Sequence, residues 1–276
     1  MVKMGKFDGI LICTDLDGTL LRNDKTISEE NREAIEYFKG EGGYFTFITG
    51  RMYFTARSLY EMVNPNAPVG CINGGGIYDY ENGEYLWSIT LPRDANELVD
   101  AVYRAVPSAG IQMNGLDKIY FCRDNQAMRD FRRRTGAPYE EGNHMTLDVP
   151  VGKVVFGDED EKNILKIAEV LHNHPRSAHF DYIRSERTLY EILPKGSSKG
   201  NLLIKLAEIL GVDKAKTVAI GDYNNDVSMI RAAGVGVAVA NAVEEAKAVA
   251  DIVTVSNEEH AVAKIIGMID RGEIRL

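Results

Sequence analysis

Two aspartates stand at the end of an apolar stretch near the start of the 276-residue chain. Asp15 and Asp17 follow the largely apolar residues 9–13, in the segment Asp-Leu-Asp-Gly-Thr. Such a stretch predicts a buried parallel strand whose carboxyl end opens into a site. Because side chains alternate along an extended chain, both carboxylates should project to one side, where a divalent ion such as Mg²⁺ would offset their repulsion. A pair of acids in a solvated loop is the alternative interpretation.

A hydroxyl, a glycine and a cation follow the second predicted strand. Thr49, Gly50 and Arg51 come directly after the apolar residues 44–48. A hydroxyl and backbone N–H groups at a strand end can hold a phosphate oxygen, and an arginine adds a planar set of donors. An ordinary turn would explain the same three residues.

A lysine occupies an unusual position in a helix predicted to begin after Ser197 or Ser198 and to end at Gly211. Lys199 lies in the first turn, where the helix dipole favours negative charge. This placement suggests a functional role, and a solvated surface lysine is the alternative interpretation.

Two further acids follow the strand predicted at residues 217–221. Asp222 and Asp226, with Asn225 between them, could supply the oxygens that Asp15 and Asp17 lack for a metal site. A simple acidic turn is the alternative. Because strands and helices alternate along the chain, we expect ligands to gather at the carboxyl edge of a parallel sheet.

These motifs resemble those of the haloacid dehalogenase superfamily, and within it the Cof-type phosphatases with a type IIB cap. The matching segments are DLDGTL at 15–20, ITGR at 48–51, SKG at 198–200 and GDYNND at 221–226. They occur in the order typical of the family, and the resemblance covers essentially the whole chain. It implies an α/β fold with a doubly wound, Rossmann-like parallel-sheet core and an inserted α/β cap domain.

The resemblance also implies a role for each matching residue. Asp15 would be the nucleophile that forms an aspartyl-phosphate, and Asp17 would act as general acid and then as general base. Thr49 would hold a phosphoryl oxygen, and Lys199 would neutralise charge. The implied Mg²⁺ site comprises Asp15, the Asp17 backbone carbonyl, Asp222 and, close by or through water, Asp226. The implied substrate contacts are Gly50, Arg51, Asn73, Gly74 and Asn225.

Glycines 74–76 follow Asn73 and precede a strand predicted at 77–80. They do not form a dinucleotide fingerprint, because that motif needs a helix after its glycines. Two interpretations remain: a backbone lip beside the phosphate, as in similar proteins, or a plain hairpin turn.

Composition excludes several other classes. The chain is 45% hydrophobic and 26% charged, which is typical of a soluble globular protein. Its net charge of −9 argues against nucleic-acid binding. The odd, widely spaced set Cys13, Cys71 and Cys122 predicts buried thiols and no disulfide framework. No apolar stretch approaches the length of a membrane span and no cleavage-like segment is evident, so we expect a cytoplasmic protein, monomer or homodimer, without a membrane partner.

The predicted elements divide the chain into a discontinuous core, residues 1–83 and 194–276, and a cap, residues 84–193. The cap is predicted to contain strands at 85–91, 111–114, 119–123, 153–156, 178–184 and 188–193, and helices at 94–106, 125–134 and 160–172. In the core, Ser28 should cap a helix, and Ser256 with Glu259 should cap the final helix. Arginines 132–134 are interpreted as a solvated helix face, with a phosphate-binding patch as the alternative.

The leading functional hypothesis is a Mg²⁺-dependent phosphatase acting on a small phosphorylated metabolite, such as a sugar phosphate, phosphoglycolate or a cofactor phosphate. A phosphomutase would use the same motifs, since it passes the phosphoryl group to a second hydroxyl in place of water. A non-catalytic sensor of a phosphorylated metabolite is the third alternative, and it would not require both carboxylates of the first motif.

Overall fold

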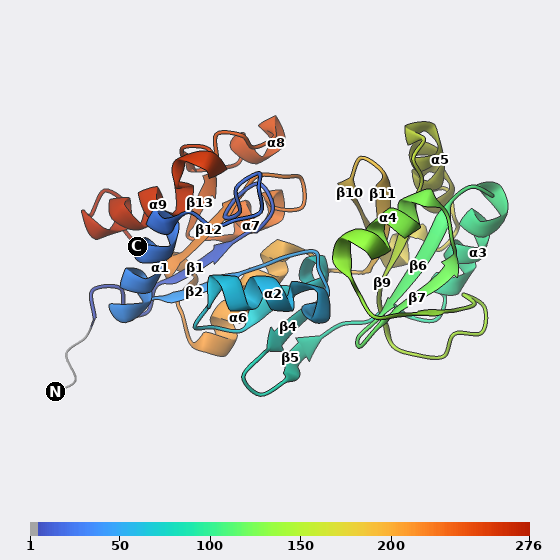
Figure 1. The fold of residues 1–276 in the computed structure, drawn as a ribbon, viewed down its shortest axis with the longest axis horizontal. Helices are drawn as coiled ribbons and strands as arrows, with labels where there is room; N and C mark the ends of the chain where they lie inside the picture. The colour runs from blue at the N-terminus through green and yellow to red at the C-terminus, as the bar shows by residue number, and fades with distance from the viewer. Residues whose placement is uncertain (1–4) are drawn as a thin grey trace. The chain divides into compact units, whose positions relative to one another are not determined.

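The computed structural model describes residues 5–276, which form two compact units (Figure 1). The core unit contains the described residues up to Gly50, then Ser58–Trp87 and Ser198–Leu276. The cap unit contains Arg51–Arg57 and Ser88–Ser197. The core is therefore discontinuous, and the cap is inserted into it. The junctions fall after residues 87 and 197, whereas the sequence placed them after 83 and 193, and it did not separate residues 51–57.

A parallel five-stranded sheet organises the core unit. Its strand order is β14-β13-β12-β1-β2, and all four neighbouring pairs are parallel. The chain leaves β1 toward β2 on one side, whereas β12, β13 and β14 continue on the other side, so β1 and β12 flank a switch point. The strands are β1 (Leu11–Thr14), β2 (Tyr44–Phe47), β12 (Thr217–Gly221), β13 (Val235–Ala238) and β14 (Ile252–Val253).

Helices of the core unit pack in pairs, α1 against α9 and α6 against α7. The helices of the core unit are α1 (Glu29–Gly40), α6 (Lys199–Leu210), α7 (Val227–Ala232), α8 (Glu244–Lys247) and α9 (Ala261–Asp270). Ser28 caps α1 by accepting a hydrogen bond from the Asn31 N–H, and Ser198 caps α6 by accepting one from the Asn201 N–H. Helix α6 ends at Gly211, which has the left-handed conformation that glycine favours. The predicted cap at Ser28 is confirmed, and of the two candidates Ser197 and Ser198 it is Ser198 that caps α6.

A second, three-stranded sheet of the core unit has the order β3-β4-β5. Its strands are β3 (Val69–Cys71), β4 (Gly76–Asp79) and β5 (Glu84–Ser88). The strand predicted at 85–91 as part of the cap is therefore shorter, and it pairs with β4 of the core unit. Helix α2 (Tyr53–Val63) begins in residues of the cap unit and ends in residues of the core unit.

The cap unit contains one six-stranded sheet of order β10-β11-β9-β6-β7-β8. Its strands are β6 (Gly110–Gly115), β7 (Ile119–Arg123), β8 (Tyr139–Glu141), β9 (Val151–Gly157), β10 (Phe180–Glu186) and β11 (Leu189–Pro194), and its remaining helices are α3 (Ala95–Ala105), α4 (Gln126–Thr135) and α5 (Glu161–His172). Helices α3 and α5 pack together over the apolar face that carries Met113, Val154 and Phe156. Because strand residues alternate between faces, Gln112, Asn114 and Lys153 lie on the opposite face.

That opposite face holds a buried ion pair. Lys153 Nζ donates to Glu191 Oε2 at 2.9 Å, and the two side chains are 7% and 3% exposed. On the same face, Gln112 Nε2 donates to Asn114 Oδ1, and Asn114 is the residue of β6 that pairs with Lys153 of β9. Both charges are desolvated at this position, and removing either partner of such a buried pair is strongly destabilising.

Several sequence predictions require correction. Strands β8 and β14 were not predicted, because three exposed residues and a two-residue strand give no recognisable alternation. The capping box at Ser256 and Glu259 is present, but it caps a short 3-10 turn at Asn257–Glu259, and α9 begins only after His260. Cys13 and Cys71 are buried, whereas Cys122 is half-buried. No helix within residues 5–276 is long and apolar enough to cross a membrane.

Candidate active site

Asp15 and Asp222 follow the two strands that flank the switch point of the core sheet. The Asp15 N–H donates to the Ile220 carbonyl at 2.8 Å, which continues the pairing of β1 with β12 beyond Thr14. Strand β1 ends at Thr14, so Asp15 is the first residue after it, and it is buried with 8% exposure. The parallel register therefore brings the carboxyl ends of both strands, and the acids that follow them, to one edge of the sheet.

Lys199 lies between two of these acids. Its Nζ donates to Asp15 Oδ1 and to Asp226 Oδ1, each at 2.6 Å. The side chains of Lys199 and Asp226 have no exposed surface. The interpretation of Lys199 as a solvated surface lysine is therefore wrong: the first turn of α6 is turned inward, and its cation compensates buried carboxylates.

Backbone donors hold the other oxygen of Asp226. Its Oδ2 accepts from the Asp222 N–H at 2.9 Å and the Tyr223 N–H at 3.0 Å. Thr19 Oγ1 donates to Asp222 Oδ1 at 2.7 Å. These bonds fix the loop after β12 and orient its acids toward the end of β1, so that Asp15, Asp222 and Asp226 offer oxygens within 4.8 Å of one another.

Burial and mutual repulsion change the proton affinity of this cluster. Burial raises the pKa of Asp15 to about 8; the Lys199 ammonium opposes the rise, and the neighbouring Asp226 and Asp222 carboxylates add to it. Burial and the Asp226 carboxylate likewise raise the pKa of Asp222 to about 6. The attraction of Asp15 and Asp226 raises the pKa of Lys199 despite its burial. The single Lys199 ammonium therefore does not neutralise all three neighbouring carboxylates.

The residues present fit a divalent metal ion. The three carboxylates and Lys199 leave an excess of two negative charges when all are ionised. Carboxylate oxygens are the ligands that hard divalent cations such as Mg²⁺ prefer. A bound cation would supply the missing positive charge and would favour the ionised form of Asp15 and Asp222.

The side chain of Asp17 has a different partner. Lys25 Nζ donates to Asp17 Oδ1 at 2.8 Å, and the two side chains are 63% and 39% exposed. Within residues 5–276 the acidic cluster contains Asp15, Asp222 and Asp226, and the predicted metal contact of Asp17 involves its backbone carbonyl. Nothing in the sequence pattern pointed to Lys25, or to Thr19 as a partner of Asp222.

A third loop adds the residues predicted to contact substrate. Ile48 N–H donates to the Thr14 carbonyl at 2.9 Å, so Thr49 follows β2 beside the end of β1. Thr49 is buried, and its carbonyl accepts from the Asn73 N–H at 3.1 Å. Asn225 Nδ2 donates to Asn73 Oδ1 at 3.1 Å. These bonds connect the loops after β2, β3 and β12.

The loop around Asn73 agrees with the hairpin interpretation of the sequence. It is a hairpin connection between the antiparallel strands β3 and β4, formed by a 3-10 turn at Ile72–Gly74. Ile72 and Asn73 have φ values of 59° and 50°, and a positive φ is strained for a β-branched residue. Gly74 has φ +107°, and a Cβ there would lie 2.4 Å from the Ser198 backbone. Only glycine permits this approach to the start of α6.

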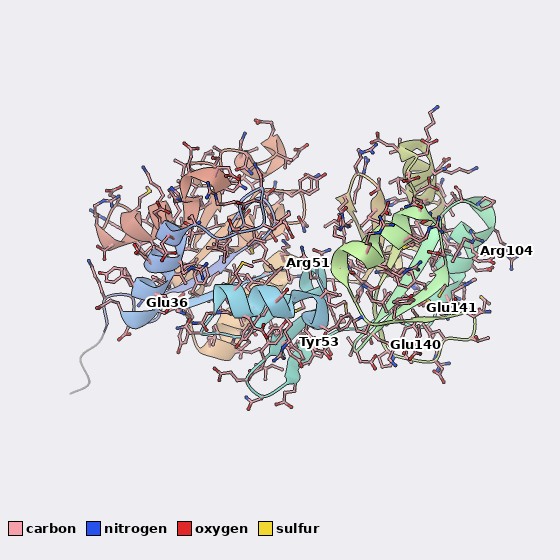
Figure 2. All side chains as sticks on the ribbon, viewed as in Figure 1. Glu36, Arg51, Tyr53, Arg104, Glu140 and Glu141 are labelled. Carbon is pink, nitrogen blue, oxygen red and sulfur yellow. The ribbon has the colours of Figure 1, made fainter. Side chains whose placement is uncertain are left out.

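The two other predicted substrate contacts, Gly50 and Arg51, belong to different units of the chain. Gly50 lies in the core unit, where a Cβ would meet the Asn73 side chain at 2.7 Å. Arg51 belongs to the cap unit and precedes helix α2 (Figure 2).

The three arginines at the end of α4 each have an acidic partner in the cap unit, which favours their interpretation as a solvated, ion-paired helix face. The pairs are Arg132 with Asp124, Arg133 with Asp130 and Arg134 with Glu186.

The sequence profile of the haloacid dehalogenase-like hydrolases matches residues 12–266. The chain is 30% identical over 267 residues to a phosphatase-named protein of Bacillus subtilis, YxeH, covering 93% of this chain and 96% of that one. It is 30% identical over 288 residues to the 5-amino-6-(5-phospho-D-ribitylamino)uracil phosphatase YwtE of Bacillus subtilis, covering 95% and 98%. A haloacid dehalogenase-like hydrolase from Bacteroides thetaiotaomicron has a similar structure, with TM-score 0.81 and 29% identity over 94% of this chain and 99% of that one.

The chain therefore belongs to the haloacid dehalogenase-like hydrolase family. Its fold, a doubly wound parallel-sheet core with an inserted α/β cap, is the one predicted from the sequence. Within the family the chain is a Cof-type phosphatase, an enzyme that hydrolyses phosphomonoesters. These predictions of family, fold class and enzyme class are confirmed.

Proposed function

We propose that this enzyme hydrolyses small phosphomonoesters with Mg²⁺ through an aspartyl-phosphate on Asp15. The observation that carries the proposal is the position of the Asp15 carboxylate, buried at the switch point and bonded to Lys199 at 2.6 Å. Burial limits competition from water, and an adjacent cation favours the ionised form that can attack phosphorus. Phosphoryl transfer depends chiefly on positioning and charge neutralisation, and the loops after the strands provide both.

In the first step, an Asp15 carboxylate oxygen would bond to phosphorus as the bond from phosphorus to the ester oxygen breaks. Asp17 would give its proton to the departing alkoxide. In the second step, Asp17 would take a proton from water as that water attacks the phosphorus and the bond to Asp15 breaks, which releases inorganic phosphate. Lys199, the Thr49 hydroxyl and the Asn225 amide would contact the phosphoryl oxygens.

Asp15, the Asp17 carbonyl and Asp222 would hold the Mg²⁺, with Asp226 beside them. When bound, the cation would neutralise charge on the carboxylates and on the phosphoryl group. Gly50, Arg51, Asn73 and Gly74 would complete the contacts to substrate. In this assignment Asp226 has mainly a structural role, because it accepts three hydrogen bonds from its own loop and from Lys199.

Relatives indicate the class of substrate. YwtE is named for a phosphoribityl compound, and the 28% identical YbhA of Escherichia coli, matched over 93% of this chain and 97% of its own length, is named a pyridoxal phosphate phosphatase. In both compounds the phosphate esterifies an alcohol on a polar organic molecule. We propose that the substrate of this enzyme is an alkyl phosphomonoester of this kind, with sugar phosphates, cofactor phosphates and phosphoglycolate as the compounds to compare.

Inorganic phosphate release from such a panel tests the proposal. The assay compares Mg²⁺ with excess chelator, and the native chain with D15N and with D130N, which alters an exposed aspartate on α4. Mg²⁺-dependent release that D15N abolishes and D130N retains is the expected result. Release that persists undiminished in D15N would exclude the nucleophile assignment, and phosphate found on an isomeric sugar would identify a mutase.

A further inference from the structure

A lysine outside the predicted set of site residues contacts the proposed acid and base. Lys25 Nζ lies 2.8 Å from Asp17 Oδ1. Exposed ion pairs contribute little when both side chains must be ordered for the purpose, so the distance alone does not establish a role. The backbone that carries Lys25, however, is held in place independently of this pair.

Lys25 occupies a tight turn with an uncommon conformation. Its φ is +67°, which is disfavoured for a residue with a side chain. The Lys25 N–H donates to the Arg22 carbonyl, and the Arg22 N–H donates to the Thr26 carbonyl, both at 2.9 Å. Asp24 Oδ1 accepts from the Thr26 hydroxyl at 2.6 Å and from its N–H at 3.0 Å. Two backbone bonds and two bonds to the Asp24 side chain thus close the turn around Lys25.

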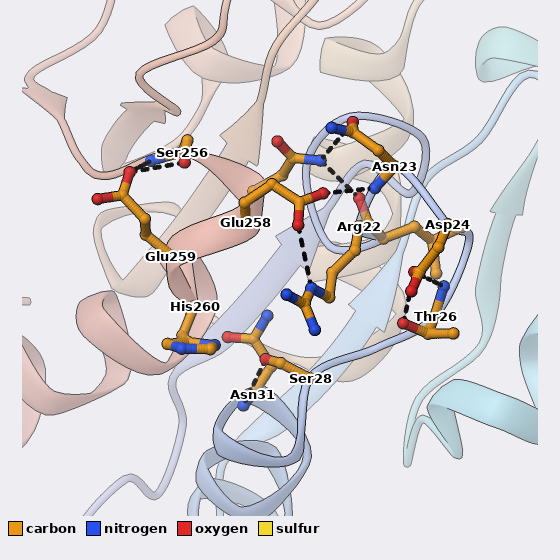
Figure 3. A network of polar contacts seen from close by, with 12 residues as sticks. Arg22, Asn23, Asp24, Thr26, Ser28, Asn31, Ser256, Glu258, Glu259 and His260 are labelled. Atoms are coloured by element: carbon orange, nitrogen blue, oxygen red, sulfur yellow. Dashed lines mark hydrogen bonds and ion pairs between the residues drawn. The ribbon is translucent and has the colours of Figure 1, made fainter.

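Side chains of the segment before α9 bind this turn by hydrogen bonds (Figure 3). Both carboxylate oxygens of Glu258 bind it: Oε1 accepts from the Asn23 N–H at 2.6 Å, and Oε2 from Arg22 Nε at 3.1 Å. Asn257 Nδ2 donates to the Leu21 carbonyl at 2.9 Å. Since these contacts join residues more than 200 positions apart, they anchor the turn to the folded core, and the strained conformation persists because its surroundings impose it.

The loop that carries Asp17 is anchored to the same segment. Asn241 Nδ2 donates to the Gly18 carbonyl at 2.8 Å, and Asn241 Oδ1 accepts from the Asn257 N–H at 3.0 Å. The backbone segments that carry Asp17 and Lys25 are therefore both connected by hydrogen bonds to the segment around Asn257. Their contact therefore requires no ordering of the backbone, and its entropic cost is limited to that of the two side chains.

We propose that Lys25 is a positioning residue for Asp17, an inference that rests on the proposed function. The Lys25 ammonium binds Asp17 Oδ1 and restricts rotation of the carboxylate. The oxygen that gives a proton to the leaving alkoxide, and later takes one from water, is thereby held in a set direction. The contribution of Lys25 to turnover is accordingly transmitted through Asp17, and it matters most when the leaving group requires a proton.

Two substrates with different leaving groups test this proposal. An alkyl phosphate, the best compound of the metabolite panel, needs protonation of its alkoxide, whereas p-nitrophenyl phosphate releases a stable phenolate without it. The variants are K25M, K25R and D17N, the double variant K25M/D17N, and the control K205M, which removes an exposed lysine paired with Glu208 on α6. Methionine is unbranched like lysine, so K25M leaves the backbone preference at this position essentially unchanged.

We expect K25M to lower kcat for the alkyl phosphate by about threefold to fivefold, the upper range for an exposed ion pair, with little change for p-nitrophenyl phosphate. K25R should restore most of the loss, K205M should have no effect, and K25M should have no further effect in the D17N background. An equal loss with both substrates, or additive losses in the double variant, would overturn the role of Lys25. The proposed function fails separately, if D15N retains phosphate release.

Discussion

Replacing Lys199 with methionine would test whether one ammonium compensates two buried carboxylates. Nζ lies 2.6 Å from an oxygen of Asp15 and of Asp226, and neither Lys199 nor Asp226 has exposed side-chain surface. Methionine retains most of the side-chain volume, so the loss isolates the charge. Removing one partner of a buried ion pair costs about 3–5 kcal/mol. Because Asp15 can take up a proton, we expect the lower end, about 3 kcal/mol of unfolding free energy, at pH 8 without metal.

The loss should shrink as the pH falls. Lys199 opposes the rise in the pKa of Asp15, so removing it should raise that pKa further above about 8. A carboxyl whose pKa is higher in the folded than in the unfolded state binds more protons when folded, and it favours the folded state as the pH decreases. Lys199 also opposes the rise of the Asp222 pKa to about 6, so K199M should recover part of its stability, relative to the native chain, between pH 8 and pH 5.5, where Asp222 takes up its proton. Mg²⁺ at pH 8 should also reduce the difference.

Denaturant unfolding at both pH values, with chelator and with Mg²⁺, measures these effects. For a chain of this size, about 3 kcal/mol corresponds to a fall in melting temperature of roughly 6–12 °C. K205M provides the matched control, because its exposed lysine should change stability by less than about 0.5 kcal/mol. A loss in K199M below about 1 kcal/mol at pH 8 in chelator, or one independent of pH, would refute the assignment of Lys199 as the compensating charge.

Three further outcomes are expected. The rise in melting temperature caused by Mg²⁺ should be larger at pH 8 than at pH 5.5 in fluorimetric melts, because protons compete for Asp15 and Asp222, whose pKa values are raised to about 8 and about 6. G74A should lose about 1–3 kcal/mol and most turnover, since φ is +107° and its Cβ would meet the start of α6; native-like melting would contradict this. K153M should lose about 3–5 kcal/mol in denaturant unfolding by removing the ammonium bonded to the buried Glu191 carboxylate, and a further E191Q change should recover part of it.

The distribution of charge explains why the site requires several loops. Asp15 alone at a strand end would be a buried carboxylate with an unfavourable free energy of desolvation. The start of α6 supplies an ammonium, and the loop after β12 supplies two more acids whose orientation is set by backbone N–H groups. The arrangement leaves negative charge that a divalent ion would offset. We therefore expect metal binding to stabilise this enzyme.

Local patterns in the sequence were sufficient for much of the fold. Ser28 was predicted as one helix cap, Ser197 or Ser198 as another, and Gly211 as a helix end, because each depends on hydrogen bonds or φ values within a few residues. The apolar strands of the core were equally recognisable, since a fully buried parallel strand is a short, continuous apolar run. The candidate site residues could be named for the same reason: the motifs place them directly after such strands.

Contacts between distant segments could not be predicted in this way. The sequence left open whether Lys199 is solvated, because burial depends on what packs against α6. It gave no indication that Lys25 reaches Asp17, since that contact depends on a left-handed turn held by Glu258, more than 200 residues away. The sequence by itself thus determined which groups stand at the strand ends, through local backbone and hydrophobic preferences. Only the tertiary structure decided which charges meet, because hydrogen bonding and desolvation depend on neighbours that the chain brings together from afar.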